Sequence, residues 1–384
     1  MSLLDNILAC YSWQGVALIG VLLLLFMVQL YYYVIVYGRI SRYRMMRRKR
    51  RASQPPVSII VVVRGENEHF LTEQLPALLA QQYQLFEVVV VYVGSDLEYY
   101  AELQSIREQY SYMRLSRMGG NERLNITDKQ AMNVGIKSAQ YDNLVFTTTY
   151  AMPRSERWIE FLALGFEYGT VVMAPMVPCF DKRGVGSYLM RMTEFHDARN
   201  YVSSAVGGHF YYAPRSNYGF TRRLYETSRG FNHLNKQIGD NDLYMQLIAT
   251  SKRTVVVMSP HSVVEEPRSG SWREWMDMMR YFTSTRCCYT SRDIRFKRWE
   301  LVSRVLFFLV AVVAIVIMPL EVKLGVALVM LLRYMAVLLS TRRTARKLGV
   351  KGVLLGYWIY DIVGPVVELF IAMGRSVDRT LIWR

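Results

Sequence analysis

The stretch that decides the fold begins with Val57-Ser-Ile-Ile-Val-Val-Val63, which runs into the polar turn Arg64-Gly-Glu-Asn-Glu68. Two later apolar runs follow the same plan: Phe86–Val93 ends in Gly94-Ser-Asp96, and Leu144–Thr147 ends in Thr148-Thr-Tyr150. Continuous apolar runs separated by helical patterns predict a parallel sheet that is buried on both faces. Because sites on such sheets lie at the carboxyl ends of the strands, we expect the three turns to line one crevice.

The alternation of strands and helices continues beyond this stretch. The prolines of Ser53-Gln-Pro-Pro56 cannot continue a helix, so the domain is expected to begin close to Val57. We therefore predict a mixed, mainly parallel α/β domain over residues 53–290. Further strands are expected at 170–174 and 254–258, and further helices at 71–78, 99–110, 129–139, 188–205 and 271–281.

The N-terminal region, residues 1–52, has the pattern of a membrane anchor. Val16–Val36 carries no formal charge and is long enough to cross the roughly 30 Å of a bilayer core as a helix. Eight of the thirteen residues from Arg39 to Arg51 are Arg or Lys. Basic flanks stay on the cytoplasmic side, so we predict a short outer tail and a cytoplasmic middle domain.

The C-terminal region, residues 291–384, returns to apolar sequence. We predict two antiparallel transmembrane helices, Leu301–Leu320 and Leu324–Ser340, joined by Glu321-Val-Lys323. The third segment, Val353–Met373, has basic residues on both flanks, which favours a re-entrant or interfacial element over a full crossing. The predicted location is the cell inner (cytoplasmic) membrane, with several crossings.

A charge inside the second of these helices needs a partner. Arg333 lies near its middle, and intramembrane charges usually face a cavity or an opposite charge. The sequence leaves three roles open for Arg333: a glycan path or subunit contact, snorkelling to the interface, or pairing with Asp361 or Glu368.

The net charge of +16 does not indicate nucleic-acid binding. Much of the excess stands beside the apolar segments, at residues 39–51, 292–298 and 342–351, where topology and anionic lipid explain it. No groove-reading motif is present, so we predict membrane lipid and no nucleic acid as a partner. The four cysteines show no metal-ligand spacing, and a reduced compartment suits them better than a disulfide framework.

Over Val57–Thr285 the chain resembles the membrane-bound glycosyltransferases of family 2, which have the GT-A fold. Arg64 and Glu66 match the first turn of that family, Gly94 and Ser95 the second, and Gly239-Asp-Asn-Asp-Leu243 the loop of the general base. The resemblance implies an inverting transfer of a sugar from a nucleotide-sugar to a lipid or glycan acceptor. It assigns Asp240 or Asp242 as the base, and Arg64, Glu66, Gly94, Lys129 and Arg280 to the donor nucleotide.

The chain departs from the family where the donor is held. Tyr92 and Val93 replace the paired acids of the second turn, and Thr148, Thr149 and Tyr150 replace the metal-binding DxD. Divalent cations prefer anionic oxygen ligands, which hydroxyl groups do not replace. We expect Mg²⁺ or Mn²⁺ only where the donor site is intact, and therefore predict no metal site here. In the QxxRW motif, Asp277 stands for Gln and Tyr281 for Trp.

The aromatic region from Tyr188 to Tyr225 is the expected acceptor groove. Aromatic faces such as those of Tyr211 and Tyr212 stack well on sugar rings.

Two functions fit these features. The sequence favours a membrane-anchored, glycosyltransferase-like protein of cell-envelope glycan or glycolipid assembly that has impaired or lost metal-dependent catalysis, as a pseudoenzyme or the partner of a companion membrane subunit. The alternative is an active inverting glycosyltransferase that works without a DxD-bound metal, with Arg154, Lys129 or Arg280 as the cation in its place.

Overall fold

The structure is a computed structural model that describes residues 13–44, 54–119, 126–180, 184–233, 242–286 and 291–373. The described residues fall into two compact units. The sheet unit contains residues 43–286 and 347–350, within those ranges, and the helical unit contains residues 13–42, 291–346 and 351–373.

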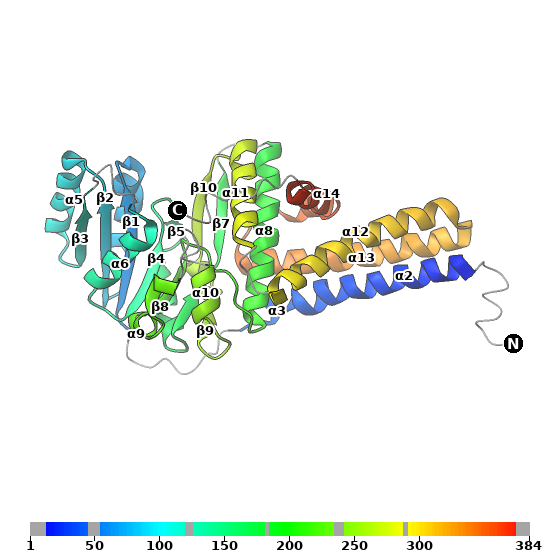
Figure 1. Cartoon of the computed structure of the whole chain (residues 1–384), viewed down its shortest axis with the longest axis horizontal. Helices are drawn as coiled ribbons and strands as arrows, with labels where there is room; N and C mark the ends of the chain where they lie inside the picture. The colour runs from blue at the N-terminus through cyan, green and yellow to red at the C-terminus, as the bar shows by residue number, and fades with distance from the viewer. Residues whose placement is uncertain are drawn as a thin grey trace. The chain divides into compact units, whose positions relative to one another are not determined.

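A seven-stranded sheet forms the centre of the sheet unit, with the strand order β3-β2-β1-β4-β8-β6-β9. The first four strands in this order are parallel, and β8 runs antiparallel to both of its neighbours. The predicted mixed, mainly parallel sheet is therefore confirmed (Figure 1). In chain order the strands are β1 (Val57–Arg64), β2 (Phe86–Val93), β3 (Met113–Met118), β4 (Asn143–Thr147), β6 (Val171–Met173), β8 (Tyr218–Thr221) and β9 (Thr254–Val256).

Helices cover the parallel part of the sheet because its strands are apolar on both sides. Every residue of β2 is buried, which explains its unbroken apolar sequence. Gly135 of α6 packs so closely on the sheet that an added Cβ would lie 2.6 Å from Ile60 and 3.2 Å from Val91. The helical segments around this part are η2 (Phe70–Gln74), α4 (Leu75–Leu79), α5 (Leu97–Gln109), α6 (Asp128–Ser138) and α7 (Trp158–Phe166).

A small second sheet, in the order β5-β10-β7, lies in the same unit. Apolar periodicity did not predict it, because its strands are short and carry Pro153, Pro178 and Pro267. Two helices accompany it, and Trp275 of α11 is buried where its ring nitrogen donates to the Thr193 hydroxyl of α8 at 3.2 Å. The elements are β5 (Met152–Pro153), β7 (Met176–Phe180), β10 (Val264–Arg268), α8 (Val185–Val206) and α11 (Trp272–Arg286); the remaining short helices are α9 (Arg222–Thr227), η3 (Gly230–His233), α10 (Leu243–Ile248) and η4 (Pro260–Ser262).

The helical unit contains three helices that are long and apolar enough to cross a membrane: Trp13–Arg42, Arg295–Ile317 and Leu320–Leu348. The first consists of α2 (Trp13–Leu30), η1 (Tyr31–Val36) and α3 (Gly38–Arg42). α12 (Ser291–Ile317) and α13 (Leu320–Leu348) meet at Pro319, and not at the predicted residues 321–323, because proline cannot continue α12.

The last helix of this unit, α14 (Leu354–Met373), is unbroken although Pro365 lies inside it. Figure 1 shows α2, α12 and α13 along the horizontal, whereas α14 is seen nearly end-on. That α14 lies at the membrane interface stays a prediction.

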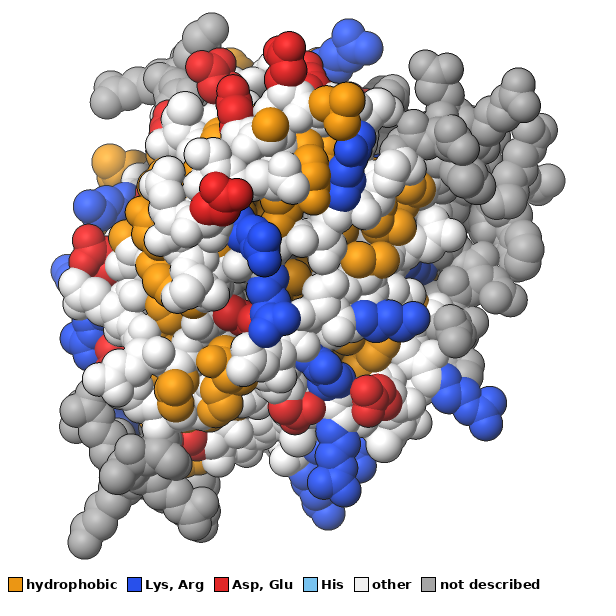
Figure 2. All heavy atoms as spheres, turned by 90° about the vertical axis from the view of Figure 1, so that its left-hand side faces the viewer, with side chains coloured by type: hydrophobic (Ala, Val, Ile, Leu, Met, Phe, Trp, Pro, Cys, Tyr) orange, Lys and Arg blue, Asp and Glu red, His pale blue; other side chains and the backbone are white. Residues whose placement is uncertain are grey.

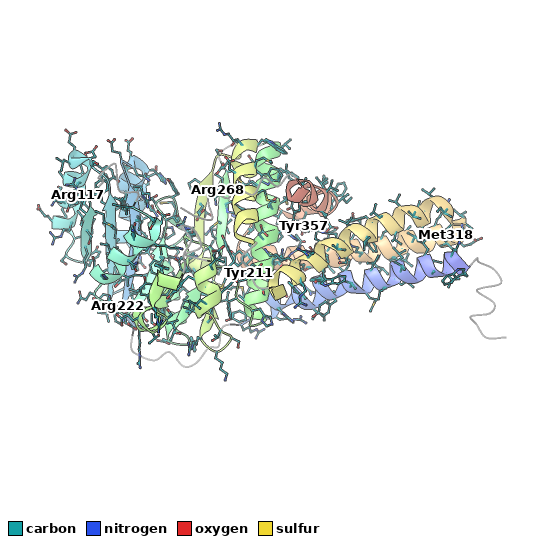
Figure 3. The ribbon with its side chains drawn as sticks, viewed as in Figure 1. Arg117, Tyr211, Arg222, Arg268, Met318 and Tyr357 are labelled. Atoms are coloured by element: carbon teal, nitrogen blue, oxygen red, sulfur yellow. The ribbon has the colours of Figure 1, made fainter. Side chains whose placement is uncertain are left out.

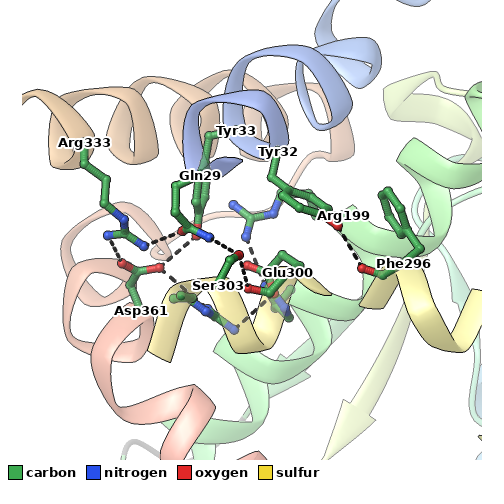
Figure 4. Close-up of polar contacts among 11 residues, drawn as sticks. Gln29, Tyr32, Tyr33, Arg199, Phe296, Glu300, Ser303, Arg333 and Asp361 are labelled. Carbon is green, nitrogen blue, oxygen red and sulfur yellow. Dashed lines mark hydrogen bonds and ion pairs between the residues drawn. The ribbon is translucent and has the colours of Figure 1, made fainter. Parts of the chain in front are cut away.

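Buried polar side chains connect four helices of this unit (Figure 4). Arg333 of α13 donates to Asp361 of α14 at 2.5 Å and to Gln29 of α2 at 2.8 Å. Tyr33 of η1 also donates to Asp361, at 2.8 Å, and Gln29 donates to Ser303 of α12. Of the roles left open for Arg333, the structure therefore shows pairing with Asp361.

Basic side chains do not form one field on the face of the sheet unit that Figure 2 shows. Lys and Arg stand there among acidic and apolar side chains. That the net charge of +16 does not mark a nucleic-acid surface stays a prediction.

Candidate active site

A cavity of about 260 Å³ opens at the carboxyl ends of β1 and β4. β1 has β2 on one side and β4 on the other, so the chain reverses its direction of winding at this point of the sheet. Such switch points are where open α/β sheets bind ligands. The lining residues include Arg64 from the first predicted turn, Thr148, Thr149 and Tyr150 from the third, and Asp128 and Arg215.

Asp128 holds two arginines at the wall of this cavity. Its carboxylate accepts a hydrogen bond from Arg64 Nε at 2.7 Å and another from Arg215 at 2.9 Å. Although burial raises the pKa of Asp128, the hydrogen bonds and charges of Arg215 and Arg64 lower it below its ordinary value. Two guanidinium groups beside one ionised carboxylate leave one net positive charge, which suits an anionic group of a ligand.

The residues at the DxD position do line the cavity, and they do not fit a divalent cation. Thr148, Thr149 and Tyr150 offer hydroxyl and carbonyl oxygens but no carboxylate. Within the described ranges, no group of three His, Cys, Asp or Glu side chains is placed to hold a metal ion. Gln74 fixes the shape of this loop, because its side-chain amide donates to the carbonyl oxygens of Thr148 and Ala151.

The second predicted turn lies at the same edge of the sheet but does not line the cavity. Val93 is paired with Arg64, and Gly94 follows directly. Glu66 faces Asp96 across this edge, and the hydrogen bond and charge of Asp96 raise the pKa of Glu66. Asp96 also begins α5, where it accepts a hydrogen bond from Tyr99 N at 2.9 Å.

A second cavity, of about 470 Å³, shares Thr148, Tyr150 and Arg215 with the first. Tyr212, predicted for the acceptor groove, lines it, and so does Asp277 of α11. Tyr211 is buried and lines neither cavity. Apolar side chains complete one wall, and four carboxylates line the cavity: Glu194, Glu266, Glu274 and Asp277.

Three of the other predicted residues, Asp242, Lys129 and Arg154, line neither cavity. Asp242 is buried and caps α10, where its carboxylate accepts from Leu243 N at 2.7 Å. Lys129 is a buried residue of α6 and lines neither cavity. Asp240 and the side chain of Arg280 lie outside the described residues. Arg154 pairs with Glu265 at 2.6 Å, away from both cavities.

The comparison with protein families decides the class of protein. Residues 21–384 match glycosyl transferase family 21. The chain belongs to this family. The resemblance to family 2 is thus confirmed at the coarser level of a GT-A-like glycosyltransferase, whereas the matching family is 21. No curated protein sequence matches this family 21 chain significantly.

Two solved structures match the family 21 chain over most of its length. The mannosyltransferase PcManGT of Pyrobaculum calidifontis, solved with GDP-mannose and Mn²⁺, has 16% sequence identity and a TM-score of 0.52; the match covers 86% of this chain and 98% of that one. Residues 1–349 of TarS from S. aureus have 16% identity and a TM-score of 0.42, with 83% and 92% of the two chains covered. At this identity the first likeness shows the fold, which is the predicted GT-A-like fold.

Sequence reasoning missed Asp128, Arg215 and Glu194. Asp128 directly precedes Lys129 in the matching helix, so its place in the first turn of α6 was a signal that could have found it. Arg215 lies in a loop without a motif, and Glu194 lies within a helix of aromatic and Met residues. Only the fold brings these two beside Thr148.

Proposed function

We propose that this family 21 chain is an active inverting glycosyltransferase, which transfers a sugar from a nucleotide-sugar to a hydroxyl group of a lipid or glycan acceptor. One observation carries the proposal: Arg64 and Arg215 meet on Asp128 in the cavity that also contains the DxD position. In the proposed reaction, these two cations take the place of a metal held by Thr148–Tyr150.

The chemistry requires two kinds of group. The acceptor oxygen attacks the anomeric carbon while its proton passes to a carboxylate, and the bond to the nucleoside diphosphate breaks. Charge develops on the leaving diphosphate, where preorganised cations lower the barrier most. We assign that neutralisation to Arg64 and Arg215, and the base to Asp240, because Asp242 is buried and its carboxylate caps α10.

The surroundings of Thr148 favour activity over an impaired enzyme. The loss of both DxD carboxylates is the observation that favours an impaired, partner-dependent subunit. Glu194 and Glu266, however, line the cavity that Thr148 shares, so acidic groups from distant elements return to this region. Charged groups from other elements thus stand near the position of the missing DxD carboxylates. This supports a changed catalytic mechanism better than a loss of catalysis.

We place the transferase in the cell inner membrane, with the sheet unit in the cytoplasm. The basic cluster after the first apolar helix supports this orientation. There it would serve the assembly of a cell-envelope glycan or glycolipid, with a membrane lipid around it and a companion membrane subunit as a further partner.

Calorimetric titration of the purified full chain with UDP and GDP tests the donor site. We expect binding in EDTA that Mn²⁺ does not strengthen, and a loss of about tenfold or more in affinity for Arg215→Met. Arg157→Met is the matched control, because Arg157 pairs with Glu160 on the surface and lines neither cavity. Binding that requires Mn²⁺, or an Arg215→Met protein that binds like wild type, contradicts the proposal.

The impaired alternative has a test of its own. If the chain acts only as a subunit, then purification from native membrane should yield a stoichiometric companion protein that has the transferase activity. If the chain is an active glycosyltransferase, we expect turnover by the single purified polypeptide.

A further inference from the structure

Glu194 of α8 is a buried carboxylate, and one of its two oxygens accepts no hydrogen bond from the described residues. Only 6% of its side chain is exposed, and Oε1 accepts a hydrogen bond from Arg268 Nε at 3.2 Å. Oε2 is buried and accepts no hydrogen bond from a described residue. A buried oxygen without a hydrogen-bond donor is energetically unfavourable, so its presence calls for an explanation.

The place of Glu194 supplies that explanation. It lines the cavity of about 470 Å³ that meets the proposed donor cavity at Thr148, Tyr150 and Arg215. A volume of this size suits a small-molecule site. Figure 3 marks Arg268 on β10, beside α8 and α11, which are the elements that form this part of the wall.

The other walls of the cavity suit a hydroxyl-bearing ligand. Tyr201 and Tyr212 pack with their ring centroids 5.1 Å apart and offer aromatic surface. Met176 and Met190 add apolar surface that adapts in shape. Stacking faces with a few carboxylates are the groups that bind the carbon and hydroxyl parts of a polyol.

We propose that Glu194 binds the acceptor substrate by accepting a hydrogen bond from one of its hydroxyl groups in this cavity. The assignment of the ligand as the acceptor rests on the proposed function, whereas the binding of a hydroxyl group by Glu194 does not. The terminal torsion of a glutamate side chain is soft, so a small rotation can present a carboxylate oxygen to a ligand in the cavity.

Charged groups from three elements set the ionisation of Glu194. Arg268 and Glu266 face it from β10, Glu274 and Asp277 come from α11, and Arg215 lines the same cavity from the loop before β8. Burial raises the pKa of Glu194, Arg268 lowers it, and Glu266 and Glu274 raise it, with a net value of about 7. An ionised carboxylate accepts hydrogen bonds more strongly than a protonated one, so binding should strengthen as the pH rises through 7.

Saturation-transfer NMR with butyl β-D-glucopyranoside, a soluble probe with four hydroxyl groups, tests the proposal on the full chain in nanodiscs. Empty nanodiscs are the blank. We expect the wild-type protein to bind the probe about tenfold more tightly at pH 8 than at pH 6, as the ionised fraction rises. Glu194→Gln should bind it more weakly at pH 8 and show no dependence on pH.

Two controls make the result specific. The tetra-O-methyl derivative of the probe keeps the sugar ring and the butyl chain but has no hydroxyl donor, so it should bind weakly and without pH dependence. Glu265→Gln removes a carboxylate of β10 that pairs with Arg154 and lines neither cavity, so it should behave like wild type.

Three outcomes overturn the proposal: no binding of the probe to the wild-type protein, equal binding of the methylated probe, or a Glu194→Gln protein that keeps the wild-type pH dependence. None of these measurements uses a nucleotide-sugar or turnover. A failed transferase assay and a failed role for Glu194 are therefore distinguishable.

Discussion

Asp128 determines where two of the proposed functional side chains stand. Its two carboxylate oxygens accept from different arginines, Arg64 at the end of β1 and Arg215 in the loop before β8. Arg64 was predictable because it ends an apolar run at the edge where parallel strands end together. Arg215 was not, since 87 residues separate it from Asp128 and nothing in its local sequence indicates a site.

Because of Glu194, the stability of the protein should fall as the pH rises above the ordinary pKa of a carboxyl group. The pKa of this carboxyl is raised from 4.5 to about 7 in the folded state. Between these values the folded chain keeps a proton that the unfolded chain has released, so stability falls as the pH rises through this window, by about 3 kcal/mol at most. Glu194→Gln removes this titration and should raise the melting temperature, relative to wild type, more at about pH 8 than at about pH 5.

Thermal denaturation of both proteins in the same detergent checks this prediction. Glu265→Gln controls for the loss of a partly exposed carboxylate. A difference between Glu194→Gln and wild type that is the same at both pH values would show that Glu194 is ionised in the folded state throughout.

At the scale of elements, apolar runs predicted structure well where burial alone selects the residues. β1, β2 and β4 are central strands with both faces covered, and their predicted bounds differ from the observed ones by one residue at most. β3 was missed because it lies at the edge of the sheet and alternates polar with apolar residues. The second sheet was missed because long-range pairing, and not local sequence, makes its short strands.

Helix α6 carries Asp128, so the packing of α6 on the sheet sets the position of Arg64 and Arg215. Gly135→Ala places a methyl group 2.6 Å from Ile60 Cγ2, which forces the helix outward. We expect a loss of about 1–3 kcal/mol of stability, because overpacking of a tight contact has that cost, together with weaker nucleotide binding.

Gly20→Ala in α2 is the matched control, because an added Cβ there meets no atom within 4 Å. It should leave both properties unchanged or slightly raise helix stability. Denaturation and calorimetry on the two proteins decide the question, and equal behaviour of the pair would show that α6 has room to move.

At the scale of the whole molecule, the helical unit is held by charges from segments far apart in the chain. Asp361 lies 3.6 Å from Arg304 and 2.5 Å from Arg333, and all three are fully buried. Asp361→Asn removes a negative charge beside two buried arginines. It should lower the free energy of unfolding by about 3 kcal/mol or more. Arg333→Leu combined with Asp361→Leu removes the pair together and should lose less stability than Asp361→Asn alone.

Unfolding of these variants in mixed micelles, followed by the loss of helical circular dichroism, measures the difference. If the double variant is the less stable of the two, then the pair stabilises the unit beyond what apolar packing supplies.

The predicted orientation belongs to the same scale. Cys179 is an exposed cysteine of the sheet unit, and Cys10 precedes the first apolar helix. In intact cells, a membrane-impermeant maleimide should label a protein whose only cysteine is Cys10, and should label a Cys179-only protein only after the membrane is opened. Labelling of Cys179 in intact cells would place the sheet unit outside.

In the proposed transferase, Arg64 and Arg215 take the place of the missing metal. The most direct test of this proposal is the transfer of a radiolabelled sugar from nucleotide-sugars to membrane lipid extract by the purified full chain in nanodiscs, with EDTA present throughout. We expect transfer that EDTA does not reduce and that Arg215→Met lowers by about a hundredfold. Transfer that EDTA abolishes, or no transfer until a companion protein is added, would contradict it.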